Sequence, residues 1–464
     1  MAFPIGFSII IMTLSIPYGF QYLFSAEIKM GWFAVFTGIF TLALFALAYL
    51  TFSSPTAITT PTEKEVDIAG PLMCVGSLSL TVFFNTTSLV AVISIMAIAL
   101  LATGLWFRWG GLIASRGVFV IAVGLGVYLL GQTPLDPGAA DMLPIVQAAG
   151  AHFLQGESPY GVVFPQASVF PFVYLPGTWL PYLPLVALDL DLRVLNLVGL
   201  IGFAVIAEML VRNASVRANA LSVALYPLLC SPILAQALVY GQVWPYWIMA
   251  ALLGVFLLQQ RLLLAAFILG LMLATRQWAV FFAWPLAVYF AGRLPLSEFV
   301  RLFIVILLGF ALLIAPIFIF DPTLFQVAFV DVAKSAPQAF LSEKVTSQVG
   351  LVALMSAAGI QSAPLVLMSL VAVVVAVLVY RCRHASPEWL IFFVGLAYIF
   401  FVTCNFQVFR YYYIPGLWFI AMSYALASER GSIKGVFDFH ERERSSLTEG
   451  VVSPTPTSVS SKST

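Results

Sequence analysis

The residues best suited to chemistry are concentrated between Asp141 and Leu185. Asp141 follows an apolar run, and small and apolar residues then recur at helical spacing over 148–154, which predicts an amphipathic helix lying on a membrane. A lone carboxylate at the mouth of a membrane cavity can act as a general base, removing the proton from a hydroxyl whose oxygen attacks an activated carbon. Because Asp is also a favoured helix N-cap, a capping role for Asp141 is the alternative.

Two tyrosines follow this predicted helix. Gly156 and Pro159 end it, Tyr160 comes next, and a second, proline-rich helix begins near Tyr174. Both tyrosines are candidates for binding a substrate beside Asp141.

Arg276 is the second charge whose position suggests chemistry. The stretch 262–292 is long enough for two helices of about 14–15 residues, or about 21 Å each, which falls short of a hydrocarbon core of about 30 Å. Their shared tip should therefore carry Arg276 into the membrane, where a charge needs a cavity and a partner. A lipid-linked phosphate is a suitable partner, since a guanidinium can donate two hydrogen bonds to it. The alternatives are that Arg276 reaches the interface or pairs with an acidic side chain.

Other polar and aromatic residues are weaker candidates for binding the same ligand. Gln242 opens an apolar span, where it either binds a hydroxyl or satisfies the backbone at a helix start. Arg410 and Tyr412 belong to a basic, aromatic run that could line a pocket or form an interfacial belt. Lys344 and Gln348 could bind phosphate, with a solvated surface as the alternative.

Asp136 and His152 are secondary candidates beside Asp141. The alternative role for Asp136 is that of a turn residue. The alternative role for His152 is that of a structural hydrogen-bond donor. The sequence has no clustered His and Cys residues at metal-ligand spacing, so no metal site is predicted. The pair Asp189 and Asp191 has the D-x-D spacing with which nucleotide-sugar enzymes hold a metal, but it lies in a short turn beside Arg193 and is interpreted as a solvated or locally paired turn.

The composition describes a polytopic membrane protein. Of the 464 residues, 62% are hydrophobic and 9% are charged, against about 45–50% and about 25% in soluble domains. A folded soluble protein could not cover so much apolar surface, which excludes a cytosolic enzyme, a secreted disulfide scaffold and a disordered protein. The net charge of +1 gives no indication of nucleic-acid binding.

Hydropathy predicts an all-α fold with about 14 transmembrane helices. The apolar stretches 171–188 and 347–360 are short, and treating them as re-entrant or interfacial helices places most Lys and Arg residues on one side of the membrane. Both termini are then cytoplasmic, and the extracytoplasmic face holds 132–193, 239–242, 275–277, 321–362 and 405–410. The predicted spans are 3–24, 31–52, 70–84, 88–107, 116–131, 194–211, 218–238, 243–260, 262–275, 278–292, 300–320, 363–380, 387–404 and 411–427.

The order of these motifs resembles the GT-C superfamily of membrane glycosyltransferases, and most closely the GT87-type mannosyltransferases that use polyprenyl-phosphate sugars. The resemblance rests on Asp141 with its small-residue helix, on the sequences ESPY and YLP around Tyr160 and Tyr174, on the run AAFILGLMLATRQ that ends beside Arg276, and on the closing aromatic segment from Asn405. It covers roughly 115–427.

Two departures from the family pattern limit what can be transferred. The family's usual Lys is Arg276 here, which keeps the charge but changes the hydrogen-bonding geometry. The usual Tyr shortly after the Asp is absent, and Pro144 and Ile145 take its place.

The range of the resemblance divides the chain into three parts. They are a module of unknown role over 1–110, a GT-C-like catalytic domain over 111–427 with outer loops 132–193 and 321–362, and a partly disordered cytoplasmic tail over 428–464.

The resemblance implies an inverting glycosyltransferase with its active site on the extracytoplasmic face. Its donor would be a polyprenyl-phosphate sugar, with mannose as the family's sugar, and its acceptor a lipid or glycan. No metal cofactor is required, and the partners are membrane lipids rather than nucleic acid. The rival hypothesis is a transporter or lipid flippase.

Overall fold

The computed structural model describes residues 71–79, 88–135, 142–166, 171–213, 225–331, 351, 364–381, 387–405 and 410–427. Within these residues the secondary structure is helical, apart from an isolated bridge between Val163 and Pro171. The predicted all-α class is therefore confirmed for the described part of the chain. The predicted spans 3–24, 31–52 and the tail 428–464 lie outside it.

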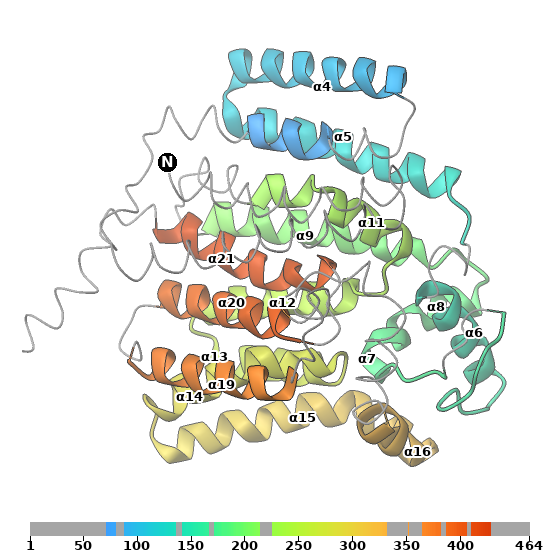
Figure 1. The fold of residues 1–464 in the computed structure, drawn as a ribbon, viewed down its shortest axis with the longest axis vertical. Coiled ribbons are helices and arrows are strands. Elements are labelled where there is room, and N and C mark those ends of the chain that lie inside the picture. The colour runs from blue at the N-terminus through green and yellow to red at the C-terminus, as the bar shows by residue number, and fades with distance from the viewer. Residues whose placement is uncertain are drawn as a thin grey trace, which may run out of the picture.

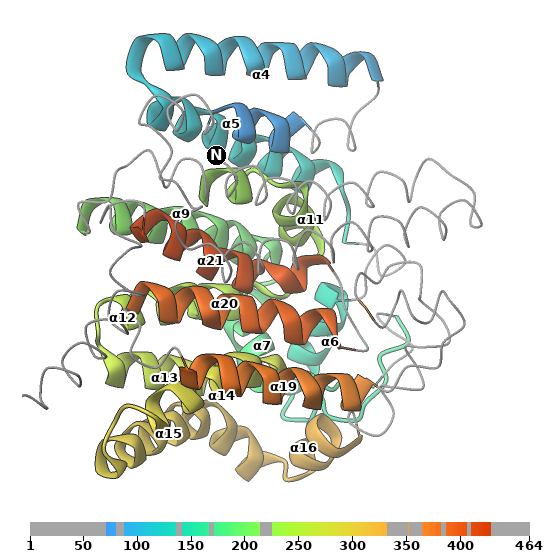
Figure 2. The same cartoon turned by 60° about the vertical axis from the view of Figure 1, so that its left-hand side comes forward.

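Most predicted spans in the described part correspond to single helices. They are α4 (Ser88–Trp109), α5 (Gly111–Gln132), α9 (Arg193–Asn213), α12 (Trp244–Leu258), α13 (Leu262–Leu273), α14 (Val280–Ala291), α15 (Leu296–Phe320), α19 (Pro364–Arg381), α20 (Pro387–Thr403) and α21 (Ile414–Ala427). Figures 1 and 2 show them stacked with their axes running broadly in one direction, as in a membrane bundle.

The described helices have the surface of a membrane protein. Three segments are long and apolar enough to cross a bilayer, namely Gly111–Gln132, Arg193–Leu210 and Leu296–Phe320, and several shorter apolar helices pack beside them. Helix α15 leaves Phe303, Leu308 and Ile319 at least half exposed. A continuous apolar surface of this kind is stable against lipid rather than water.

The structure interrupts the predicted span 218–238. Residues 225–229 are helical, the chain turns at Cys230 and Ser231, and α11 (Pro232–Tyr240) begins after them. Pro232 has no N–H to continue a helix and disfavours the helical conformation of the residue before it, which is why Ser231 is extended. The expected single helix is therefore broken within the described residues.

Helices α13 and α15 cross in direct backbone contact. A Cβ on Gly270 would lie 3.0 Å from the Cα of Gly309, and one on Gly309 would lie 3.3 Å from the Cα of Gly270. Small residues at such crossings let membrane helices approach closely. This crossing fixes α13, and with it the segment that follows α13.

The short helices are gathered at one end of the bundle, which we call the loop end (Figure 1). They are α6 (Met142–Leu154), α7 (Pro176–Trp179), η1 (Leu180–Tyr182), α8 (Leu183–Ala187), α16 (Thr323–Phe325) and η3 (Gln326–Asp331). Their buried side chains form a second core that includes Trp179 and Leu324 and reaches Ala274 and Ile317 at the ends of α13 and α15.

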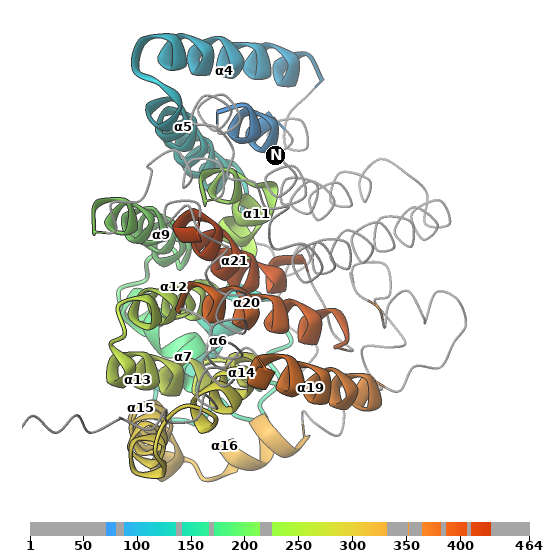
Figure 3. The same ribbon diagram turned by 90° about the vertical axis from the view of Figure 1, so that its left-hand side faces the viewer.

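The opposite end, which we call the arginine end, contains the α4–α5, α12–α13 and α14–α15 connections (Figures 1 and 2). Arg108, Arg261 and Arg293 lie at these connections. The side view in Figure 3 shows α19, α20 and α21 beside α12 and α14.

Candidate functional site

Arg276 lies between two helices that are too short to cross a membrane. Helices α13 and α14 have 12 residues each, or about 18 Å. They are joined by Ala274–Arg276 and the 3₁₀ turn η2 (Gln277–Ala279). This is the arrangement that the spacing of Arg261 and Arg293 predicts.

The Arg276 side chain is buried and has no carboxylate partner among the described residues. It is 7% exposed, and its Nε and Nη2 atoms make no hydrogen bond. The ion pairs of the described chain involve other residues. Because buried charged groups are nearly always paired, an unpaired guanidinium indicates a place for an anion.

Aromatic rings surround the guanidinium in place of acids. The Cζ atom of Arg276 lies 5.5 Å from the centre of the Tyr174 ring and 5.4 Å from that of Trp278. Tyr412, on η5 (Arg410–Tyr413), in turn contacts Trp278. These cation–π contacts hold the charge without neutralising it. Tyr174 and Tyr412, both candidates from the sequence, are thus brought to Arg276.

Three further tyrosines at this site were not predicted. Tyr182, Tyr246 and Tyr398 each interact electrostatically with the guanidinium of Arg276. The buried hydroxyls of Tyr246 and Tyr398 interact with each other, and neither makes a hydrogen bond of normal geometry with a described residue. Hydroxyls beside an unpaired cation are able to hydrogen-bond a polar ligand.

The segment that carries Arg276 is held by two loop-end elements. On one side, the Gly177 N–H donates to the Ala274 carbonyl at 3.0 Å, and the Thr178 hydroxyl donates to the Thr275 carbonyl. On the other side, the Gln277 side-chain N–H donates to the Ala328 carbonyl at 2.9 Å. Two segments that are distant in sequence, one on each side of Arg276 along the chain, therefore position it together.

We expect Gly177→Ala to lower activity by displacing α7 from Arg276. A Cβ on Gly177 would lie 3.0 Å from the Cα of Thr275, which is backbone and cannot move aside cheaply. Overpacking of this kind costs about 1–3 kcal/mol, so the melting temperature should fall with the activity.

The matched control for this substitution is Gly124→Ala in α5, where a Cβ would meet nothing within 4 Å. Thermal unfolding and turnover of both variants test the expectation. Equal behaviour of the two variants would contradict the role of the Gly177 contact.

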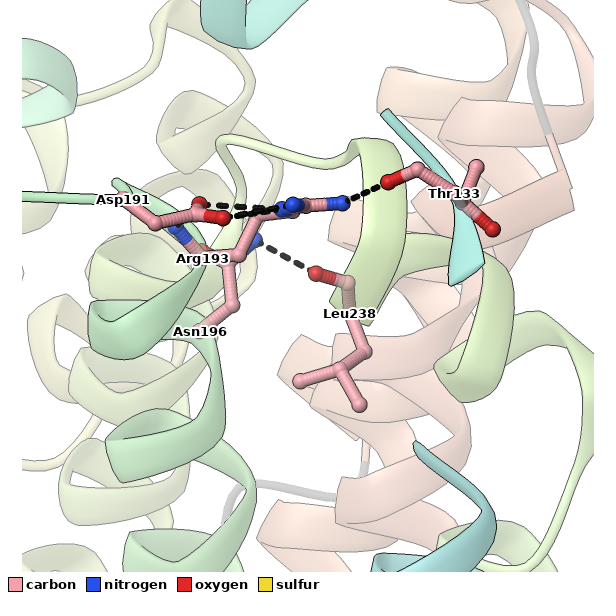
Figure 4. Close-up of polar contacts among 5 residues, drawn as sticks. All are labelled: Thr133, Asp191, Arg193, Asn196 and Leu238. Atoms are coloured by element: carbon pink, nitrogen blue, oxygen red, sulfur yellow. Dashed lines mark hydrogen bonds and ion pairs between the residues drawn. The ribbon is translucent and has the colours of Figure 1, made fainter. Parts of the chain in front are cut away.

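A polar network fixes the turn that contains Gln242. Asn196 accepts a 2.7 Å hydrogen bond from the Tyr182 hydroxyl and donates to the Gly241 carbonyl at 2.8 Å. It also donates to the Leu238 carbonyl at 2.9 Å (Figure 4). One buried amide thus ties η1, α9 and the α11–α12 turn together. Tyr182, which faces Arg276, is positioned by this network.

Asp191, one of the two acidic residues of the predicted turn, lies beside this network. Arg193 bonds both carboxylate oxygens of Asp191 and also donates to the Thr133 carbonyl (Figure 4). Burial acts to raise the pKa of Asp191, but the hydrogen bonds and charge of Arg193 outweigh it and hold the pKa below its usual value. Asp191 is thus locally paired, as predicted.

Gln242 has a buried and unsatisfied side chain. It is 1% exposed, and neither its amide oxygen nor its amide nitrogen has a hydrogen-bond partner. It follows Gly241, which Asn196 holds in place. An amide in this state can bind a ligand hydroxyl, which is one of the two roles that the sequence leaves open for Gln242.

Tyr160 belongs to the structural support of the loop end. Its hydroxyl accepts a 3.1 Å hydrogen bond from the Trp179 indole. Nearby, Ser158 donates to Asp321, which also accepts from the Thr323 hydroxyl and N–H. Burial acts to raise the pKa of Asp321, but these hydrogen bonds outweigh it and lower the pKa below its usual value.

We expect the Asp321 contacts to stabilise the protein only while the carboxyl is ionised. A lowered pKa means that the contribution is complete above the unfolded-state value of about 3.9 and is lost as the pH falls through the lower folded-state value. The melting temperature of Asp321→Asn should therefore be below that of the wild type at pH 6, and the difference should shrink below about pH 4. Glu298→Gln, which removes an exposed carboxylate on α15, is the control. A difference that is independent of pH would contradict this account.

His152 makes its contacts with residues that do not belong to the Arg276 site. Its Nδ1 pairs with Glu157 at 3.1 Å, and its ring packs edge-on against Phe164. These contacts correspond to the structural alternative considered for His152.

The remaining sequence candidates lie outside the described residues. They are Asp136, Asp141, Lys344 and Gln348, together with the side chain of Arg410. Met142, the first residue of α6, is described, and its sulfur accepts a hydrogen bond from Tyr411 at 3.3 Å. The start of α6 is therefore adjacent to η5, whose Tyr412 contacts Trp278 beside Arg276.

The described residues contain no group of three or more His, Cys, Asp or Glu side chains that could hold a metal ion. Comparisons with protein-family models, with curated proteins and with solved structures find no significant match to this chain.

Proposed function

We propose that the protein is an integral-membrane inverting glycosyltransferase that moves a sugar from a polyprenyl-phosphate donor to a lipid or glycan acceptor. The observation that carries the proposal is Arg276, a buried guanidinium with tyrosines and a tryptophan around it and no described carboxylate beside it. A site built this way favours an anion whose other groups are apolar or hydroxylated, as they are in a lipid-linked sugar phosphate.

In the proposed reaction, Asp141 removes the proton from the acceptor hydroxyl. The oxygen forms a bond to the anomeric carbon as the bond from that carbon to the phosphate oxygen breaks. The lipid phosphate leaves with the electron pair, and Arg276 balances its charge. Gln242, Tyr246 and Tyr398 supply hydrogen bonds to the sugar or phosphate.

The proposal includes a topology with the loop end on the extracytoplasmic side and both termini in the cytoplasm. It is supported by the arginines at the opposite end, because basic residues are retained on the cytoplasmic side of membrane proteins. The GT-C-like arrangement with about 14 spans and the choice of mannose belong to the same proposal.

Incubation of the purified protein with a panel of radiolabelled polyprenyl-phosphate sugars tests the proposal. We expect one sugar to be transferred and the lipid phosphate to be released. Counterflow of a labelled substrate in proteoliposomes without product would instead support the rival transporter or flippase.

A further inference from the structure

A second site lies at the arginine end, away from Arg276. Helices α12, α13, α14 and α15 enclose a partly open pocket of about 500 Å³, counted with its mouth. Its walls are entirely apolar. The space exists because α13 and α14 present small side chains to it, namely Ala265, Ala266, Ala283 and Ala287.

The pocket borders the part of α15 that faces lipid. Phe299 and Phe303 of α15 form one wall, and Phe303 is 53% exposed. A pocket without polar atoms does not hold ordered water. In a membrane, hydrocarbon is the available material to fill it.

Three arginines lie next to the residues that line the pocket. Arg261 directly precedes the lining residue Leu262, Arg293 follows the lining residue Phe290 by three positions, and Arg301 directly precedes Leu302. Glu298 is the one acid on these connections, and it pairs with Arg301 at 3.8 Å with both side chains more than half exposed. Such a surface pair is weak, so the mouth keeps a positive charge.

We propose that this pocket binds an acyl chain of an anionic phospholipid, whose headgroup pairs with Arg261, Arg293 and Arg301. Basic residues at the end of an apolar pocket between membrane helices suit the negative headgroup and the chain of one lipid. The site is separate from Arg276, and the inference does not depend on the proposed glycosyltransferase activity.

Native mass spectrometry of the purified full-length chain tests this inference, using phosphatidylglycerol and phosphatidylcholine with identical acyl chains. We expect the protein to retain one phosphatidylglycerol, with at least fivefold preference over phosphatidylcholine. Ala287→Phe, which fills the pocket, should lower retention of both lipids at least fivefold.

The charge is tested by Arg261→Gln combined with Arg301→Gln, both of which are exposed side chains. This variant should bind both lipids equally. Arg108→Gln, at the same end but on α4, is the matched control and should keep the preference. These exposed substitutions test the inference even if Ala287→Phe does not fold.

Three results would overturn the inference. They are no retained lipid, equal binding of the two lipids by the wild type, and an equal loss of preference in the Arg108→Gln control. One-for-one displacement of phosphatidylglycerol by polyprenyl phosphate would also overturn it, because the pocket would then belong to the chain of the donor.

Discussion

Arg276→Gln is expected to abolish sugar transfer and to raise the stability of the protein at the same time. Loss of a fixed donor to developing negative charge typically lowers the turnover rate about 100- to 1,000-fold. Stability should rise because the substitution replaces a buried charge that makes no ion pair with a described residue by a neutral amide, and burial of an unpaired charge costs more than burial of a neutral polar group. Turnover and thermal unfolding of the same variant measure the two effects.

Arg276→Lys separates charge from geometry. Lysine keeps the positive charge but loses the planar guanidinium, which can donate two hydrogen bonds to a phosphate. We expect transfer to recover to within about tenfold of the wild type, since a lysine can still bind phosphate as a point charge.

Arg116→Gln is the matched control for the effect on stability. Arg116 donates two hydrogen bonds to Glu208 across α5 and α9, with its Nε at 2.7 Å from one carboxylate oxygen. Its removal leaves Glu208 without its cation, so the melting temperature should fall. If Arg276→Gln lowered the melting temperature as Arg116→Gln does, Arg276 would be a structural residue.

The sequence was sufficient to locate Arg276 because the constraint on it is local. Two basic residues, Arg261 and Arg293, bound a stretch that is too short for two full spans, and helix geometry then places Arg276 at its middle. In the structure α13 and α14 have 12 residues each, against about 20 for a helix that spans a membrane. The prediction of two short helices is therefore confirmed.

The tyrosines around Arg276 could not be predicted in the same way. Tyr182, Tyr246 and Tyr398 come from η1, α12 and α20, and each sits in an apolar sequence where a tyrosine is usually a core or interface residue. The chain has 17 tyrosines, and the packing of distant helices decides which of them meet at one point. A hydropathy pattern carries no information about that packing. By contrast, the break before α11 had a local signal, Pro232, that outweighs the apolar run around it.

Asp141→Asn is expected to stop transfer while leaving donor binding and folding nearly unchanged. A general base contributes about 100- to 10,000-fold to the rate, and an amide cannot accept the proton of the acceptor. Asn is as good an N-cap as Asp, so the substitution removes the base but keeps any capping of α6. Binding of a labelled polyprenyl-phosphate sugar should stay within about twofold, because Arg276 and the tyrosines remain.

Asp141→Ala completes this test because alanine can neither accept the proton nor cap a helix. Loss of a cap costs about 0.5–2 kcal/mol, so this variant should be inactive and also less stable than Asp141→Asn. If Asp141→Asn transferred sugar at the wild-type rate while Asp141→Ala only lost stability, the role of the carboxylate would be limited to capping α6. The acceptor proton would then have to leave by another route, and Arg276 would be a phosphate site without this base.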